Sequence, residues 1–219
     1  MSSSGKVSAK ATVSHKSVVG KEVTVADRAI ISGRPKLWGK AVVEDTARIS
    51  GKAHVSGHAT VSGAATVRGS AKVSGHAVIT DDAVVKGKSS VLGRAEISGS
   101  SAVSERAEVR GRAQVRDRAH VSGHAEVRQS AVVRDKAQVT DNAHVSGDAV
   151  ISGSAVVGRG AHVSQTHHVL TATVDGEDWT VYRTRKDGIG ATRGDRGVRR
   201  RDIPKQLKVL AREAWAGGA

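Results

Sequence analysis

Ten histidines are the side chains of this sequence best suited to chemistry. An imidazole titrates near neutral pH, so a histidine within reach of an acceptor can serve as a general base. Two pairs, His54 with His58 and His120 with His124, have the HxxxH spacing that on a helix would bring two rings to one zinc ion. Both stretches read HVSGH and lack the glutamate of the helical zinc-protease motif. We therefore predict no metal site.

Other reactive groups are scarce. The chain has no cysteine, which excludes disulfides, thiolate nucleophiles and cysteine-based zinc sites. It also lacks a G-x-x-x-x-G-K-[ST] phosphate loop. Residues 188–197, GIGATRGDRG, are glycine-rich but have no strand-to-helix context for a dinucleotide, and the arginines at 199–201 are typical of a solvated linker. We expect no resident cofactor.

The segment that must position most of these histidines is a six-residue repeat. Every sixth residue from Val7 to Val169 is aliphatic, which gives 28 positions with 22 Val, 5 Ile and Leu37. Two residues earlier, from Gly5 to Ala161, 21 of 27 positions are Ala. Two residues later, 14 positions are Gly and 6 are Asp. No insertion breaks this register.

A period of six predicts a short strand followed by a corner. In Ala-x-Val the first and third residues face the same side of a strand, so both point inward. The Gly or Asp that follows tolerates positive φ and turns the chain. Repeated strands with equal corners form coils that hydrogen-bond to one another at about 4.8 Å. The fold class is therefore all-β, a β-solenoid.

This six-residue unit resembles the hexapeptide repeat of left-handed parallel β-helices, over residues 7–169. It is most similar to the A-x-V-x-G-x tandem-repeat proteins of bacteria and phages, many of which are labelled acyltransferases. The resemblance implies three hexads per coil and a single-stranded left-handed parallel β-helix of about nine coils, about 43 Å long. Enzymes of that family transfer acyl groups from acyl-CoA, usually as trimers, with a histidine as general base.

With three hexads per coil, outward residues 18 apart stack, as His144 with His162 and His58 with His76. If the chain is an acyltransferase, His144 and His162 are its candidate catalytic residues and acetyl-CoA is its cosubstrate. The uninterrupted hexads lack the inserted loop that builds the family's pocket, so such a site would lie wholly between subunits. The favoured interpretation is that these histidines are exposed surface residues.

Cations also form columns on the expected coil, within a chain of formal net charge +14. One corner column reads Lys16, Arg34, Lys52, Ser70, Lys88, Arg106 and His124, and adjacent columns stack Arg110 with Arg128 and Arg116 with Arg134. These residues are polyanion-binding candidates for nucleic acid or anionic glycan. The favoured alternative is a solvated surface that keeps rods apart. Since the solenoid has only Trp38 for base stacking, we do not expect base-specific recognition.

The C-terminal segment is expected to cap the solenoid, which divides the chain into a repeat domain of residues 1–169 and a cap of residues 170–219. Two β-rich runs around Asp175-Gly176 predict a hairpin, and a second turn is expected at Lys186-Asp187-Gly188. A basic glycine-rich linker then leads to a short helix over residues 202–216. That helix is predicted to have Asp202 as its N-cap, Pro204 in its first turn and Leu207, Leu210, Ala211 and Ala214 on one face.

Most aromatic rings, Trp179, Tyr182 and Trp215, fall in this segment and are expected to seal the core. The N-terminal end shows no comparable cap. Because Val7 is already in register, the first coil is predicted either to associate with another copy or to fray.

Composition sets the remaining expectations. With no Phe, the core must consist of Val, Ile and Ala. No apolar run of about 18 residues exists and the N-terminus lacks a secretory signal, so we expect no membrane insertion and a protein that is cytoplasmic when synthesised.

Three functions remain open. The first is a non-catalytic rigid rod that self-associates, as a trimer or end to end through its N-terminal coil, with other virion or assembly proteins as partners. Such a rod would be incorporated into a phage virion or a bacterial assembly. The alternatives are the acyltransferase and a nonspecific polyanion binder.

Overall fold

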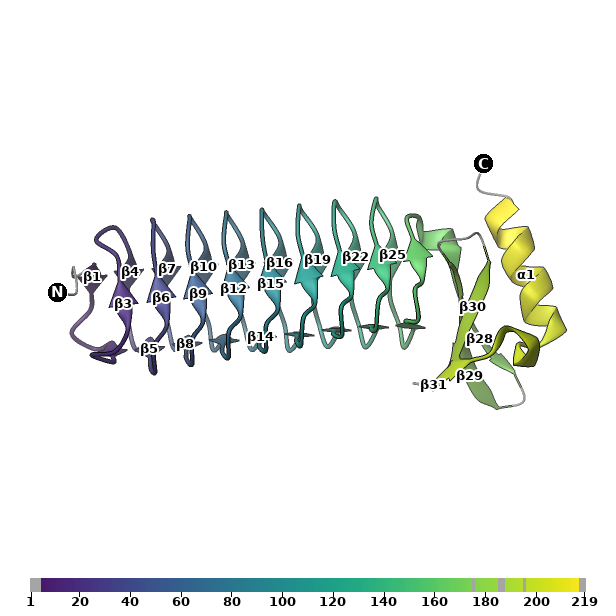
Figure 1. Ribbon diagram of the computed structural model, residues 1–219, viewed down its shortest axis with the longest axis horizontal. Helices are drawn as coiled ribbons and strands as arrows, with labels where there is room; N and C mark the ends of the chain where they lie inside the picture. The colour runs from purple at the N-terminus through teal and green to yellow at the C-terminus, as the bar shows by residue number, and fades with distance from the viewer. Residues whose placement is uncertain (1–4, 175, 185–187, 195, 217–219) are drawn as a thin grey trace.

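The computed structural model describes residues 5–174, 176–184, 188–194 and 196–216. Within them the chain forms a rod of stacked coils, followed by a small sheet and a helix at the C-terminal end (Figure 1). The rod consists of three parallel sheets with nine two-residue strands each. Thr60 pairs with Val42 on one side and with Val78 on the other, so one coil takes 18 residues. The predicted nine-coil solenoid with three hexads per coil is confirmed.

The strands of the three sheets follow one another in rotation along the chain. The first sheet contains β1 (Lys6–Val7), β4 (Thr24–Val25), β7 (Val42–Val43), β10 (Thr60–Val61), β13 (Val78–Ile79), β16 (Glu96–Ile97), β19 (Gln114–Val115), β22 (Val132–Val133) and β25 (Val150–Ile151). The second contains β2 (Thr12–Val13), β5 (Ile30–Ile31), β8 (Arg48–Ile49), β11 (Thr66–Val67), β14 (Val84–Val85), β17 (Ala102–Val103), β20 (His120–Val121), β23 (Gln138–Val139) and β26 (Val156–Val157). The third contains β3 (Val18–Val19), β6 (Lys36–Leu37), β9 (His54–Val55), β12 (Lys72–Val73), β15 (Ser90–Val91), β18 (Glu108–Val109), β21 (Glu126–Val127), β24 (His144–Val145) and β27 (His162–Val163).

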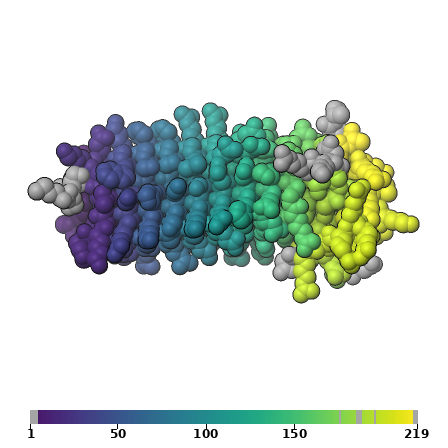
Figure 2. All heavy atoms as spheres, viewed as in Figure 1, coloured from purple at the N-terminus to yellow at the C-terminus, as the bar shows by residue number. Residues whose placement is uncertain are grey.

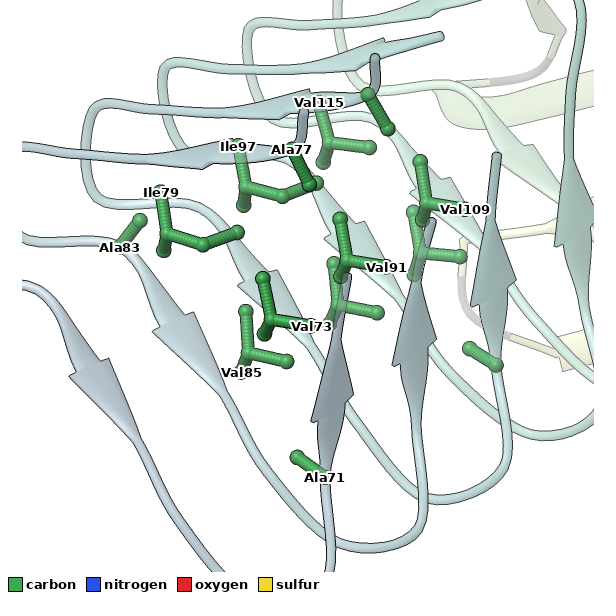
Figure 3. Packing of buried hydrophobic residues seen from close by; sticks show 14 of the residues in the cluster. Ala71, Val73, Ala77, Ile79, Ala83, Val85, Val91, Ile97, Val109 and Val115 are labelled. Atoms are coloured by element: carbon green, nitrogen blue, oxygen red, sulfur yellow. The ribbon is translucent and has the colours of Figure 1, made fainter. Parts of the chain in front are cut away.

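The inward side chains form one continuous apolar core. Val73, Ile79 and Val91 have no solvent exposure, and the alanines of the repeat pack between such residues (Figure 3). Where Ser89 or Ser101 replaces alanine, the hydroxyl donates a hydrogen bond to a backbone carbonyl, at 2.8 and 3.1 Å respectively. The buried hydroxyls are therefore satisfied and cost the core little.

The corners behave as the repeat predicts from the second coil onward. Every corner residue from Asp27 to Arg159 has positive φ, whereas Ala9, His15 and Lys21 of the first coil do not. Glycine corners lie at φ between 62° and 79°, and corners with a side chain lie between 45° and 61°. At most glycine corners, such as Gly51 and Gly99, an added Cβ would lie within about 3 Å of the backbone of the next coil.

Polar corner side chains also bond along the rod. The carboxylates of Asp45 and Asp81 each accept a hydrogen bond at 2.8 Å, from the amides of Gly63 and Gly99, one coil further on. Gln129 makes the same bond to Gly147 at 2.7 Å through its amide oxygen. Asp at a corner thus tolerates the left-handed backbone and ties two coils together.

The solenoid ends with β27, and the next aliphatic residue in register, Val169, begins a different sheet. A short 3-10 helix η1 (Thr166–His168) leads into β28 (Val169–Val174), which pairs with β29 (Glu177–Arg183) in an antiparallel hairpin. The predicted hairpin is confirmed, although Asp175 of its turn lies outside the described residues. The second expected turn also lies there, apart from Gly188.

The cap extends the hairpin to four strands. The expected glycine-rich linker forms β30 (Ile189–Arg193) and β31 (Arg196–Val198), which complete the antiparallel sheet in the order β28-β29-β30-β31. Pairing with β29 satisfies the backbone hydrogen-bonding groups of β30. The glycine-rich composition of this segment did not predict that pairing. The arginines at 199–201, also expected in a linker, partly form the 3-10 helix η2 (Arg200–Asp202).

The helix α1 (Lys205–Ala216) differs from the prediction in its start and in its buried face. Asp202 is not its N-cap, because its carboxylate binds Arg199 Nε at 2.9 Å, and the carbonyl of Pro204 accepts the bond from Lys208 instead. Leu207 is buried as predicted, but Leu210 is 48% exposed. Ala211 and half-buried Trp215 complete the buried face, whereas Ala214 is exposed, and Ile203 packs in the same cluster from just before the helix.

The cap sheet lies between the end of the solenoid and the helix (Figure 1). Tyr182 points toward the solenoid and joins its core, as predicted for the rings of this segment. Trp179 and Trp215 belong instead to a second cluster, between the sheet and α1.

Side chains of the cap also satisfy the backbone of the last coil. The amide of Val156 donates to Thr180 Oγ1 at 3.0 Å, and Thr192 Oγ1 donates to the carbonyl of Val156 at 2.8 Å. Val150 donates in the same way to Thr166 Oγ1 at 3.1 Å. The cap therefore closes strand edges that would otherwise be open.

Candidate functional site

The predicted basic column exists as a row along one corner of the rod. Its five cations, Lys16, Arg34, Lys52, Lys88 and Arg106, are all exposed, and successive coils place them in line. Among the described residues none of the five forms an ion pair with an acid. Arg106 Nη1 lies 3.5 Å from His124 Nε2, the next member of the column. The five exposed side chains therefore lie in one row, without an acidic ion-pair partner in the described part of the chain.

The second predicted stack, Arg110 with Arg128, is offset by acids on the neighbouring strands. Arg110 lies 3.0 Å from Glu108 and 3.9 Å from Glu126. The Nε atom of Arg128 is buried and has no hydrogen-bond partner within the described part of the chain. These arginines, with Gly111 and Gln129, line a hollow of about 400 Å³.

Arg116 and Arg134 stack one coil apart on another wall. Arg116 is exposed and Arg134 is half-buried.

The predicted histidine ladders are also present. His144 pairs in register with His162, with ring centroids 6.3 Å apart and planes inclined by 52°. His58 and His76 stack at 4.8 Å with planes within 8° of parallel. The 18-residue stacking rule that located both pairs is confirmed.

His144 has a carboxylate partner of the kind that suits general-base chemistry. Its Nδ1 lies 3.3 Å from Glu126 Oε2, which would hold the ring in one orientation. Both groups lie half-exposed on the wall of the rod, and Figure 2 shows the coils as parallel ridges along that body. In the described residues no three His, Asp or Glu side chains form a metal-binding group.

The HxxxH pairs are separated by the corner between their members. His54 lies in β9, whereas His58 follows the corner glycine Gly57. The zinc interpretation of this spacing fails because it requires a helix.

His168 ends η1, between the solenoid and the cap sheet, and is buried there. Its Nδ1 lies 3.4 Å from the amide of Ser164, and Arg183 Nη1 lies 3.1 Å from its Nε2. This histidine joins the end of the solenoid to the cap sheet.

The fold changes the acidity of Tyr182. Burial raises the pKa of its phenol to about 12, although Arg159 nearby acts in the opposite direction. The ring therefore stays neutral across the physiological range. It acts as a core residue at the joint between solenoid and cap.

Sequence reasoning missed a hollow in the cap. About 390 Å³ in volume, it is lined by Trp179, Arg193, Arg196, Gly197, Val198, Arg199 and Asp202. The available signal was the recurrence of arginine at every third position from 193 to 199, next to the strand that carries Trp179. Only pairing of the expected linker as strands brings these residues together.

Comparisons with known proteins give one match. A family model described as YdcK Beta solenoid repeat matches residues 143–159, which lie in the last coils of the rod. No curated protein and no solved structure matches the chain. None of the helices in the described residues has the length and apolar character needed to span a membrane.

Proposed function

We propose that this protein is a non-catalytic structural module, a rigid rod that self-associates as part of a phage virion or a bacterial assembly. The observation that supports this proposal most directly is the uninterrupted stack of nine strands in each of three sheets. No loop is inserted between the coils from β1 to β27. A wall without inserted loops lacks the element that could enclose a substrate. A rod of this kind suits spacing and mechanical support.

Rigidity follows from the way in which the coils hold one another. Each coil hydrogen-bonds to its neighbours on all three sheets, and polar corners such as Asp45 and Asp81 add bonds outside the strands. Stability of such a solenoid is close to a sum of neighbour interactions, so a long stack has no flexible joint. At about 4.8 Å per coil the repeat spans about 43 Å.

Self-association is supported by the contrast between the two ends of the solenoid. Side chains of the cap close the last coil, whereas among the described residues β1, β2 and β3 each pair on one side only. Val7 is 42% exposed, although its counterparts in later coils are buried. Open strand edges beside apolar side chains favour pairing with another chain. We place the joint at this end; a lateral trimer is the alternative.

The YdcK solenoid match supports the repeat class of the final coils. We further propose that the whole six-residue repeat is of the hexapeptide type and that its coil is left-handed. The acyltransferase labels of similar sequences are not part of this proposal. His144 has a carboxylate partner, but it lies on an open wall.

Analytical ultracentrifugation of the full chain, with electron microscopy of the same sample, tests the proposal. We expect concentration-dependent association and rods joined end to end, and Val7→Lys should weaken the joint. Val78→Lys, which changes an exposed valine in the middle of the rod, is the matched control. A monomer at all concentrations would refute self-association. Saturable binding of acetyl-CoA that is lost in His144→Ala would replace the structural function by the enzymatic one.

A second candidate function is nonspecific polyanion binding, which the exposed basic column favours. Retention on heparin should then fall steeply with salt, because binding releases counterions. Replacing Lys52, Lys88 and Arg106 by Gln should reduce the salt concentration of elution. Replacing Arg28, Arg118 and Lys136, which are exposed at another corner, removes the same charge and serves as the control. Equal effects of the two triple variants would refute a role for this column.

A further inference from the structure

The arginine-lined hollow of the cap is built by side chains that share one face of the sheet. Trp179 pairs with Arg193 across β29 and β30, and Arg193 pairs with Arg196 across β30 and β31. Directly paired residues point to the same side of an antiparallel sheet. The row Trp179–Arg193–Arg196 therefore crosses three strands on the face that also carries α1.

The helix covers the rest of this face. Val181 and Ala191, the next residues of the same face, are buried in the cluster that contains Leu207 and Ala211 of α1. Arg193 and Arg196, by contrast, are exposed. Arg199 and Asp202 close the hollow from the segment that leads into the helix. The fold thus leaves one end of the sheet open and lines it with arginine.

The charge of the hollow is strongly unbalanced. Three guanidinium groups line it against one carboxylate, that of Asp202. Two charged residues that do not line the hollow contact the lining residues. Glu177 binds Arg193 at 3.0 Å and Arg201 lies 3.8 Å from Asp202, so their opposite charges cancel. Among the described residues, two positive charges therefore remain uncompensated.

Two of the three guanidiniums are already held in place. Arg193 is fixed by Glu177, and its guanidinium carbon lies 5.9 Å from the centroid of the Trp179 ring. Arg199 is fixed by the 2.9 Å contact of its Nε with Asp202. Arg196 forms no ion pair among the described residues, yet it stands directly opposite Arg193. Like charges opposite each other on paired strands are unfavourable unless an anion offsets them.

We propose that this hollow binds a phosphate monoester, whose doubly charged phosphate matches the two uncompensated charges. Guanidinium groups hold phosphate through paired N–H donors, and donors that are already oriented lose little entropy on binding. Arg196 is the anchoring residue, and Arg193 and Arg199 complete the ring of donors. The hollow is large enough for a small organic group attached to the phosphate.

Isothermal titration calorimetry of the full chain with glycerol 3-phosphate tests this site. We expect one site per chain and a loss of affinity of about tenfold or more in Arg196→Gln, because a charge-assisted fork is removed. Arg196→Lys, which keeps the charge but not the fork, should lose an intermediate amount. The matched control is Arg112→Gln, an exposed arginine of the solenoid, whose effect should stay below about twofold. Thermal unfolding of each variant verifies that the fold is intact.

A dinucleotide with a single phosphodiester distinguishes the two sources of phosphate. Weaker binding of this singly charged probe than of the monoester supports the proposal. Tighter binding of the dinucleotide, lost in Arg196→Gln, would overturn the monoester in favour of a nucleic-acid backbone. Equal losses in Arg196→Gln and Arg112→Gln, or no saturable binding, would overturn the site itself.

Discussion

Replacing Asp81 separates the two physical roles of a polar corner. Its carboxylate accepts a 2.8 Å hydrogen bond from the amide of Gly99 in the next coil, and its φ of 59° lies in the left-handed region. Asp81→Ala removes the bond and leaves a residue that tolerates this φ poorly. Asp81→Gly removes the same bond but introduces a residue that adopts this positive φ without strain.

The expected changes in the free energy of unfolding follow from the lost hydrogen bond and from the backbone strain at this corner. A hydrogen bond to a charged acceptor contributes about 1.5–3 kcal/mol, and solvent exposure of this corner places the value at the lower end. A left-handed alanine costs about 1 kcal/mol more than glycine. We therefore expect Asp81→Ala to lower the free energy of unfolding by about 2–3 kcal/mol. Asp81→Gly should lower it by only about 1 kcal/mol.

Urea unfolding followed by far-UV circular dichroism measures both changes, and hydrogen exchange of the Gly99 amide reports the bond directly. Asp82→Ala is the matched control, because exposed Asp82 carries the same charge beside the corner and has no side-chain hydrogen bond to the next coil among the described residues. Its effect should stay below about 0.5 kcal/mol. The reasoning is refuted if Asp81→Gly destabilises the protein as much as Asp81→Ala, or if Asp82→Ala matches either.

Three further predictions concern the core and the cap. Tyr182 is the only tyrosine, so phenolate absorbance should report its ionisation near pH 12 in the folded protein. The free energy of unfolding should fall by about 2 kcal/mol as pH rises from 10 to 12, because the unfolded phenol ionises first; Tyr182→Phe should lack this fall. Thr180→Val should cost about 1–3 kcal/mol in urea unfolding, because the buried amide of Val156 loses its acceptor, and exposed Thr171→Val should cost little. Ile97→Val should cost about 1 kcal/mol and Ile97→Ala about 2–5 kcal/mol in the same assay, and equal costs would contradict a close-packed core.

The repeat was predictable because each of its positions carries a local constraint. Aliphatic Val and Ile, alanine and a corner residue recur with no change of spacing, so strand, inward face and turn can be assigned one hexad at a time. The ladders of His58 with His76 and of His144 with His162 then follow from the 18-residue coil. The number of hexads per coil and the left hand came from the resemblance, since a period of six permits other coils.

The cap was less predictable because its strands depend on partners. The hairpin of β28 and β29 has a strong turn signal, but β30 contains Gly190 and β31 contains Gly197, which composition assigns to a linker. Both glycines are needed where neighbours approach, since a Cβ at Gly190 would meet the Tyr182 ring and one at Gly197 would meet the Arg159 side chain. A glycine required by packing cannot be told from a flexible glycine in one sequence.

The prediction of the helix's buried face was partly wrong for a similar reason. A helical wheel ranks Leu210 with Leu207, but the face that packs in the cluster with the sheet contains Leu207, Ala211 and Trp215. The angle at which a helix meets its partner decides which stripe is covered, and the helical pattern of the sequence does not contain that angle.

The sequence by itself determined the solenoid, its inward valines, its corners and its columns of charge, because a repeating chain meets the same neighbours in every coil. Only the tertiary structure decided how the last coil is closed and where Trp179, Arg193, Arg196 and Arg199 meet. That arrangement depends on contacts between segments that do not repeat. A local sequence pattern determines the structure only where each residue contacts the equivalent residues of other repeats. This condition holds for the rod but not for its cap.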